Sequence, residues 1–156
     1  EILIKGANVF LGYFKNEEAT KAVFTKDGWF RTGDMGVVDE DGCLFIKGRS
    51  KCMILGPSGQ NIYPEEVETV INSQPYVVDS LVVEDDGGLT ALIYPDFAQG
   101  AKDGMNQDTF IKYIEDTLPE LNKELPNYAK LKKIEVMSED FERTPKKSIK
   151  RYLYQR

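Results

Sequence analysis

The sequence predicts an α+β fold, in which antiparallel strands precede a small domain with a mixed or antiparallel sheet and packed helices. Up to residue 48, short alternating apolar stretches are separated by turn residues, which is typical of a meander of antiparallel strands. After Arg49, strand-like stretches alternate with segments whose apolar residues recur at helical spacing. With 156 residues, 41% of them hydrophobic, the chain has the composition of globular protein.

The elements follow in order along the chain. The meander comprises the strands 1–6, 30–40 and 43–49, and its Asp-rich turn 39–42 lacks the spacing of a calcium loop. A strand at 52–56 is followed by a helix at 64–73, which has Pro64 at a first helical position and acids in its first turn. Further expected elements are strands at 77–85 and 88–96, a helix at 107–118, a strand at 130–137 and a short closing helix at 146–154. Residues 98–107 read as a mobile loop.

Composition excludes several classes of chemistry. The chain has no His, so it cannot form a Ser-His-Asp triad or an imidazole metal site, and we expect no metal site within it. Cys43 and Cys52 are isolated thiols, which is typical of a protein of the reducing cytoplasm. No apolar run approaches the length needed to span a bilayer. The chain also opens within a predicted strand and without Met, so we expect a piece of a longer protein.

Positive charge gathers near the end of the chain. From Lys130 onward there are nine Lys or Arg against four acids, although the whole chain carries a net charge of -6. The dense run "RTPKKSIKR", residues 143–151, lies in this part. Such asymmetry indicates either a solvated basic end or a site for an anionic partner.

Two short motifs have open readings when taken alone. The loop "ILGPSGQNI", residues 54–62, has the Gly-x-x-Gly spacing of a KH-type RNA-binding loop, but it lacks basic residues and two acids follow it; a tight turn explains the glycines equally well. In "GWFRTGDMG", Asp34 follows a glycine at the edge of a strand, where its carboxylate could accept hydrogen bonds from a diol such as ribose or could simply stabilise a turn.

Taken together and in order, three stretches resemble the late core motifs of the adenylate-forming superfamily. They are "GYFKNEEATKAVFTKDGWFRTGD", "GRSKCMILGPSGQNIYPEEVE" and "RTPKKSIKR", and with them the resemblance covers nearly the whole chain. The extra residue in the loop 56–59, together with "NIYPEE" and "LNKELPNY", resembles the long-chain fatty acyl-CoA ligase branch.

The resemblance implies the C-terminal part of an acid–CoA ligase. Residues 1–48 would end a large nucleotide-binding domain, 49–52 would be a hinge, and 53–156 would form a mobile C-terminal domain. The partners implied are a fatty acid, ATP with Mg²⁺, and CoA as co-substrate. Mg²⁺ would be bound mainly by the N-terminal domain, without which the fragment is expected to be inactive. We expect a cytoplasmic protein with no nucleic-acid partner, and contact with a membrane surface is compatible with this function.

The resemblance also assigns residues. Asp34 and Arg49 would hold the ribose hydroxyls of ATP or AMP, and Lys51 falls at the hinge position. Leu55, Gly56 and Gly59 would line the tunnel for the pantetheine arm of CoA. Two alternatives remain open: an adenylation domain of a peptide synthetase and, from a different class, a KH-like RNA-binding module.

The adenylation lysine of the family is displaced in this sequence. Alignment of "RTPKKSIKR" with the family pattern puts Ser148 in the lysine column, with Lys147 and Lys146 one and two residues away. In the family this lysine touches the attacking carboxylate and the α-phosphate, where a fixed ammonium group stabilises the charge of the transition state. The resemblance therefore makes Lys147 or Lys146 the candidate catalytic residue.

Overall fold

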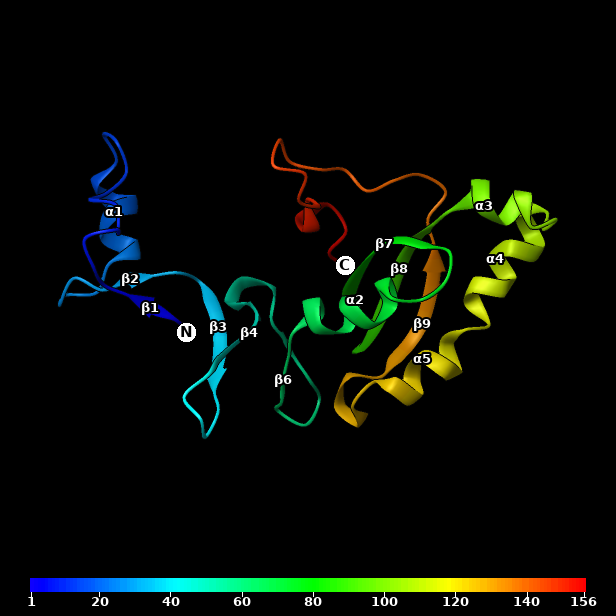
Figure 1. Ribbon diagram of the computed structural model, residues 1–156, viewed down its shortest axis with the longest axis horizontal. Coiled ribbons are helices and arrows are strands. Elements are labelled where there is room, and N and C mark those ends of the chain that lie inside the picture. Colours follow the sequence, from blue (N-terminus) through cyan, green and yellow to red (C-terminus); the bar gives the residue numbers. More distant parts are fainter. The chain divides into compact units, whose positions relative to one another are not determined.

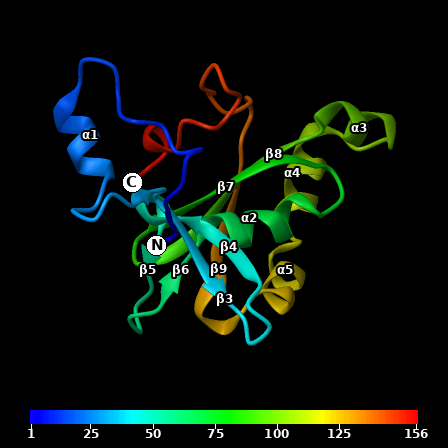
Figure 2. The ribbon, with the colours of Figure 1, turned by 60° about the vertical axis from the view of Figure 1, so that its left-hand side comes forward.

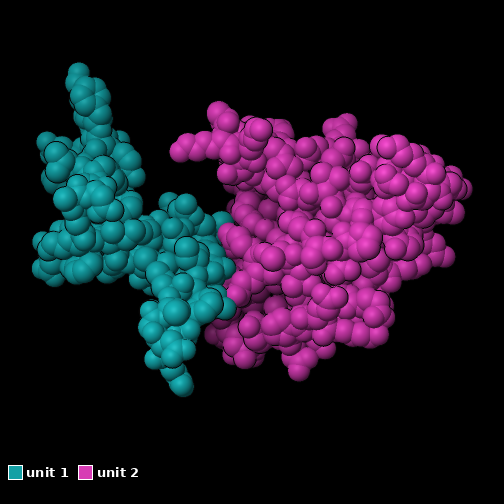
Figure 3. Space-filling model, in the orientation of Figure 1, with its two compact units in different colours: residues 1–53 teal, residues 54–156 magenta.

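The structure, a computed structural model, describes residues 1–156. The chain divides into two compact units, residues 1–53 and residues 54–156 (Figure 3). Each unit is described by itself. No helix in either unit combines the length and apolar character that a bilayer crossing requires.

The first unit contains two separate pairs of antiparallel strands rather than one meander. β1 (Leu3–Ile4) pairs with β2 (Phe30–Arg31), and β3 (Asp34–Val38) pairs with β4 (Leu44–Arg49). The expected strand 30–40 is interrupted at Gly33, whose φ of +75° takes the backbone out of the extended conformation. A short 3₁₀ helix, η1 (Ser50–Cys52), ends the unit.

A helix that the sequence analysis did not predict lies between β1 and β2. In α1 (Glu17–Val23) the Asn16 side chain accepts a hydrogen bond from the Ala19 N–H at 3.0 Å, which is the geometry of an N-cap. Beside it, the Phe10 ring lies 5.1 Å from the Phe30 ring, centroid to centroid. None of residues 1–53 is buried, so this unit has no core of its own.

The second unit is built on a three-stranded mixed sheet, which confirms the predicted α+β class (Figures 1 and 2). Its strands are β7 (Val77–Asp85), β8 (Gly88–Pro95) and β9 (Leu131–Val136), in the order β7-β8-β9. β7 and β8 are antiparallel and joined through Asp86 and Gly87, both with positive φ, as a two-residue hairpin turn requires. β8 and β9 are parallel. The helices are α2 (Pro64–Asn72), α3 (Phe97–Lys102), α4 (Gln107–Glu115) and α5 (Leu118–Glu124).

The two faces of this sheet are covered differently. One face contributes Val82, Ala91 and Ile93 to a core that Ile71 of α2 and Phe110 of α4 complete. The opposite face packs Leu81, Val83 and Leu92 against Phe141, which belongs to the segment after β9. Figure 1 shows this C-terminal segment, orange to red, on the side of the sheet away from α4 and α5. Helices therefore cover one face and the basic C-terminal segment covers the other.

Several expected elements differ in the structure. Residues 97–102 form α3, not a loop, because the Asp96 side chain caps the helix by accepting from the Gln99 N–H. The expected closing helix is only one turn of 3₁₀ helix, η3 (Arg151–Leu153). The expected strand 52–56 is reduced to β5 (Ile54–Leu55), which pairs with β6 (Asn61–Ile62). A further 3₁₀ turn, η2 (Asn127–Ala129), precedes β9.

Candidate functional site

Asp34 and Arg49, the two predicted nucleotide-binding residues, lie side by side in the first unit. They are direct partners in the register of β3 and β4, and Arg49 Nε lies 2.9 Å from Asp34 Oδ1. Both side chains are accessible, with 33% of Asp34 and 62% of Arg49 exposed. An oriented carboxylate beside a guanidinium group can bind a diol and an anion together.

The turn before Asp34 is held by its own hydrogen bonds. The Thr32 hydroxyl donates to the Ile2 carbonyl at 2.8 Å and accepts from the Asp34 N–H at 3.0 Å. Arg49 Nη1 adds a hydrogen bond to the Thr32 carbonyl at 3.3 Å. Asp34 is therefore the first residue of a strand whose start is fixed by hydrogen bonds.

Lys51, the predicted hinge residue, lies in η1 near the end of the first unit. The side chain is exposed, and the second unit begins three residues later at Ile54. The boundary between the compact units falls between residues 53 and 54.

The Gly-x-x-Gly loop joins two strands, β5 and β6, and not a strand and a helix as expected. Gly59 N–H donates to the Gly56 carbonyl at 2.9 Å, and Gly56 N–H donates to the Gln60 carbonyl at 2.8 Å. Gly59 has a φ of +79°, so the loop is a tight hairpin turn that ends on a left-handed residue. At Gly56 a Cβ atom would lie 3.1 Å from Ile62 Cδ1, which favours glycine there by close packing.

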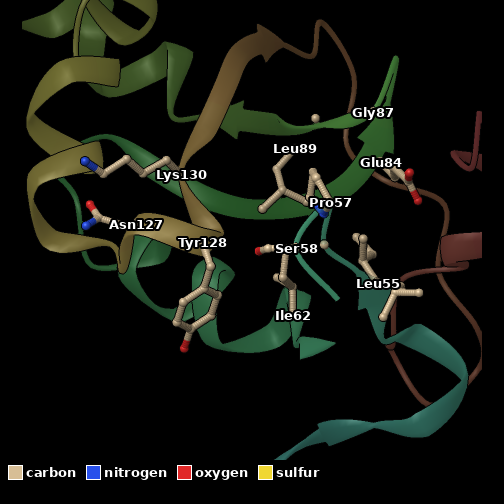
Figure 4. A pocket seen from close by; sticks show the side chains of 13 residues that line it. Leu55, Pro57, Ser58, Ile62, Glu84, Gly87, Leu89, Asn127, Tyr128 and Lys130 are labelled. Atoms are coloured by element: carbon tan, nitrogen blue, oxygen red, sulfur yellow. The ribbon is translucent and has the colours of Figure 1, made fainter. Parts of the chain in front are cut away.

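This loop forms one wall of a pocket of about 690 Å³ (Figure 4). Leu55, Pro57 and Ser58 face Leu89 of β8 and Tyr128 of η2 across the space. The predicted CoA-binding residues Leu55 and Gly56 both line it, whereas Gly59 does not. The volume lies within the range of small-molecule sites in proteins.

Lys146, Lys147 and Ser148 lie at the exposed tip of a second hairpin, residues 143–151. An isolated bridge between Arg143 and Ile149 closes it, and Thr144 N–H donates to the Ser148 carbonyl at 2.8 Å. Within the second unit, neither lysine ammonium has a hydrogen-bond or ion-pair partner. Both amines are therefore free in that unit to meet an anion, and we call residues 143–151 the lysine hairpin.

Two arginines that the sequence analysis did not select hold the lysine hairpin to its unit. Arg143 Nη2 lies 2.9 Å from Asp79 Oδ2 and 2.8 Å from Asp140 Oδ1. Arg151 Nη2 donates to Glu68 Oε2 on α2, and the other Glu68 oxygen accepts from the Val82 N–H at 2.7 Å. Burial raises the pKa of the Glu68 carboxyl above its ordinary value, although Arg151 and the Val82 N–H both act to lower it.

One feature of the sequence could have revealed Glu68. The buried side of α2 consists of Pro64, Val67, Glu68 and Ile71, the spacing of one helical face. A carboxylate on an apolar face needs a partner, because a buried charge without one is costly. That partner is 83 residues away in the chain, so no local pattern could identify it.

Comparison with known proteins gives a consistent assignment. The AMP-binding enzyme C-terminal domain family matches residues 52–156. The long-chain-fatty-acid–CoA ligase FadD15 of Mycobacterium tuberculosis is 33% identical over 171 residues, which cover 97% of this chain and 28% of that protein. A probable 4-coumarate–CoA ligase of Dictyostelium discoideum is 53% identical over 83 residues, 53% of this chain and 15% of that protein. This chain therefore spans less than a third of either relative.

A solved structure agrees with these matches. It is the o-succinylbenzoate CoA synthetase of Bacillus subtilis in complex with an acyl-adenylate intermediate, and it superposes with a TM-score of 0.75 at 30% identity. The match covers 99% of this chain and 30% of that one. The family match, the fold and these relatives together show that the chain belongs to the adenylate-forming superfamily, as a member of the AMP-binding enzyme C-terminal domain family.

Proposed function

We propose that the chain is the C-terminal part of an ATP-dependent ligase that joins a long-chain fatty acid to CoA. The observation that carries the proposal is the family match over residues 52–156, the part of the chain that bears both the pocket of the 54–62 loop and the lysine hairpin. The named relatives are acid–CoA ligases, and they act on different acids. The fatty acid is proposed from the likeness to FadD15. It is also proposed from the sequence features that resemble the long-chain fatty acyl-CoA ligase branch, namely the loop 56–59, "NIYPEE" and "LNKELPNY".

In the first half-reaction, a carboxylate oxygen of the acid attacks the α-phosphorus of ATP. The bond from that phosphorus to the bridging oxygen breaks, so that acyl-AMP forms and pyrophosphate leaves. Asp34 and Arg49 would hold the ribose hydroxyls, and their fixed pairing supports this role. Lys147 or Lys146 would neutralise the charge that gathers between carboxylate and phosphate, where one donor is worth about 10²- to 10³-fold in rate.

In the second half-reaction, the CoA sulfur attacks the acyl carbon, the thiol proton is released and AMP leaves. The pocket of the 54–62 loop would receive the pantetheine arm, with Leu55 and Gly56 on its wall. Pantetheine is a thin and largely uncharged chain, so it needs close approach to the backbone and no basic side chains. Residues 54–62 contain no Lys or Arg, which fits such a ligand, and the charged residues that line the pocket, Glu84 and Lys130, lie outside this loop.

Residues 49–52 would allow the C-terminal domain, residues 53–156, to turn between the two half-reactions, with Lys51 at the hinge. The 54–62 loop and the lysine hairpin both belong to the second unit, which supports this role. If one rigid domain serves both half-reactions, it must bring one loop and then the other to the reacting groups. No group of three or more Cys, Asp or Glu side chains in the chain could hold a metal ion.

The full-length parent enzyme tests the proposal. Pyrophosphate exchange into ATP is measured with a long-chain fatty acid, 4-coumarate or o-succinylbenzoate, and CoA thioester formation is measured with each. We expect both activities with all components present and the highest kcat/KM for the fatty acid. A preference for an aromatic acid would contradict the fatty-acid assignment alone. If no acid supported exchange, the ligase assignment would be wrong.

A further inference from the structure

The lysine hairpin is attached at its base and free at its tip. Phe141, just before it, is 3% exposed and packs in the core under the sheet, where Tyr154 meets it with ring centroids 5.3 Å apart. Lys150, in the returning strand, lies 3.0 Å from Glu142. The segment Pro145–Ser148 is exposed throughout. The direction in which the tip lysines point is therefore set by what holds the two sides of the base.

Both sides of that base are fastened at the same edge of the sheet. β7 is an edge strand, since the strand order is β7-β8-β9. Arg143 reaches Asp79 at the start of β7. Arg151 reaches Glu68, whose second oxygen accepts from the N–H of Val82. The Glu68 carboxylate thus accepts a hydrogen bond from a backbone N–H of the edge strand and, with its other oxygen, binds the lysine hairpin.

The Glu68–Arg151 pair joins the two sides of the unit. Glu68 belongs to α2, which packs on the helix-covered face, while the lysine hairpin belongs to the segment that covers the opposite face. The start of α2 also follows directly on the 54–62 loop, because Pro64 comes two residues after Ile62 of β6. One turn of helix therefore separates the pocket loop from the residue that holds the lysine hairpin.

The pair is poorly explained by stability alone. Glu68 is 8% exposed and the Arg151 side chain is 24% exposed, so both groups lose much of their hydration. Removal of charges from water offsets most of the attraction between them, and well-packed neutral side chains often replace such pairs without loss of stability. Neutral side chains cannot supply a directional, charge-assisted hydrogen bond such as the one that fixes the Arg151 guanidinium group against the Glu68 carboxylate.

We propose that Glu68 is a positioning residue for the adenylation half-reaction: through Arg151 it fixes the lysine hairpin relative to α2, so that the tip lysine meets the reacting carboxylate and phosphate. This inference rests on the proposed function. Misplacement of a catalytic group by about 1 Å costs roughly 100-fold in rate. Loss of one of the two clamps, with Arg143 still bound to Asp79 and Asp140, should cost less.

The experiment uses the full-length parent with Glu68→Gln, Arg151→Gln and the double variant. Glu115→Gln, an exposed carboxylate on α4 with no partner within its unit, is the matched control. We expect acid-dependent ATP–pyrophosphate exchange to fall about tenfold in kcat for Glu68→Gln, equivalent to about 1.4 kcal/mol. The KM for ATP and the thioesterification of preformed acyl-AMP should stay within about twofold of wild type.

The double variant separates positioning from folding. It removes both charges of the Glu68–Arg151 pair at once, so neither is left buried without the other. Glu65, whose Oε1 lies 3.9 Å from Arg151 Nη2, loses that cation but has 31% of its side chain exposed, so the thermal midpoint should stay close to that of wild type. If Glu68 acts through Arg151, the double variant loses no more exchange activity than Arg151→Gln alone.

Exchange at the wild-type rate in the folded double variant would overturn the inference, as would equal losses in both half-reactions. Absence of exchange in the wild-type parent would instead refute the proposed ligase function.

Discussion

Arg143 links the lysine hairpin to the rest of its unit through two ion pairs. Its guanidinium group contacts Asp79 and Asp140 and donates to the Lys147 carbonyl at 3.3 Å. The hydrogen bond from Arg143 holds the pKa of the Asp140 carboxyl below its ordinary value. The charged form of Asp140 is thus favoured in the folded state.

Replacement of Asp140 by Asn should lower stability in a pH-dependent way. Because the pKa of Asp140 is lower in the folded than in the unfolded state, its contribution is present above the unfolded pKa of about 3.9 and is lost as the pH falls through the folded value. The Asp140 side chain is 49% exposed, so we expect only a few tenths of a kcal/mol at pH 7. Thermal unfolding of wild type and Asp140→Asn between pH 7 and 2.5 measures it; a gap that widens toward acid would contradict this account.

Among single residues, the sequence could indicate candidate site residues, but it could not show which residues distant in the chain form ion pairs with each other. The resemblance assigns Asp34 and Arg49 together to the ribose hydroxyls, but only the register of β3 and β4 shows that they are direct partners. The ion pair of Arg143 with Asp79 spans 64 residues, and that of Arg151 with Glu68 spans 83. Such contacts depend on the tertiary fold, which no local spacing reveals.

At the level of the elements, four turns share one geometry. Each has four residues and ends on a left-handed residue: Gly28 before β2, Gly42 in the β3–β4 connection, Gly59 in the β5–β6 loop and Lys147 in the lysine hairpin. Glycine adopts this conformation without steric cost, whereas an L-residue with a side chain pays roughly 1–2 kcal/mol. Lys147 therefore occupies a position at which the three sister turns have glycine.

Replacement of Lys147 by Gly should stabilise the fold while it removes an amine from the site. The relief of backbone strain, less the extra entropy of glycine in the unfolded chain, predicts a gain of about 0.5–1 kcal/mol. Chemical denaturation of the two proteins measures it. Lys146→Gly, where φ is not positive, is the matched control and should lose stability slightly. Equal effects of the two substitutions would contradict the assignment of strain to Lys147.

The sequence predicted the larger elements better than the short ones. The sequence predicts five of the larger elements: β7, β8, α2, α4 and β9. In each of them the spacing of the apolar residues is typical of a strand or of a helix. α1 and α3 were missed, although the Asn16 and Asp96 caps were legible as N-terminal signals. The closing segment 146–154 was assigned to a helix, but its side chains are instead used in ion pairs and in packing under the sheet.

At the scale of the whole molecule, the second unit alone holds a core and both candidate loops. Its α+β class could be predicted because strand-like stretches alternate with stretches whose apolar residues recur at helical spacing. The resemblance of three ordered motifs indicated the superfamily, and residues 52–156 match a family of that superfamily. The sheet order and the division of its faces between helices and the C-terminal segment could not be predicted, because they depend on contacts distant in sequence. The hinge at 49–52 and the roles of the site residues remain predictions.

The division of the two half-reactions between the two loops is tested by measuring both half-reactions in the full-length parent with Lys147→Ala and with Ser58→Trp. Lys147→Ala should lower acid-dependent ATP–pyrophosphate exchange by about 100-fold or more and leave thioesterification of preformed acyl-AMP nearly intact. Ser58→Trp, which fills the pocket of the 54–62 loop, should do the reverse, with Ser58→Ala as its control. If Lys147→Ala and Lys146→Ala both exchanged at the wild-type rate, or if each variant impaired both half-reactions equally, the account would be contradicted.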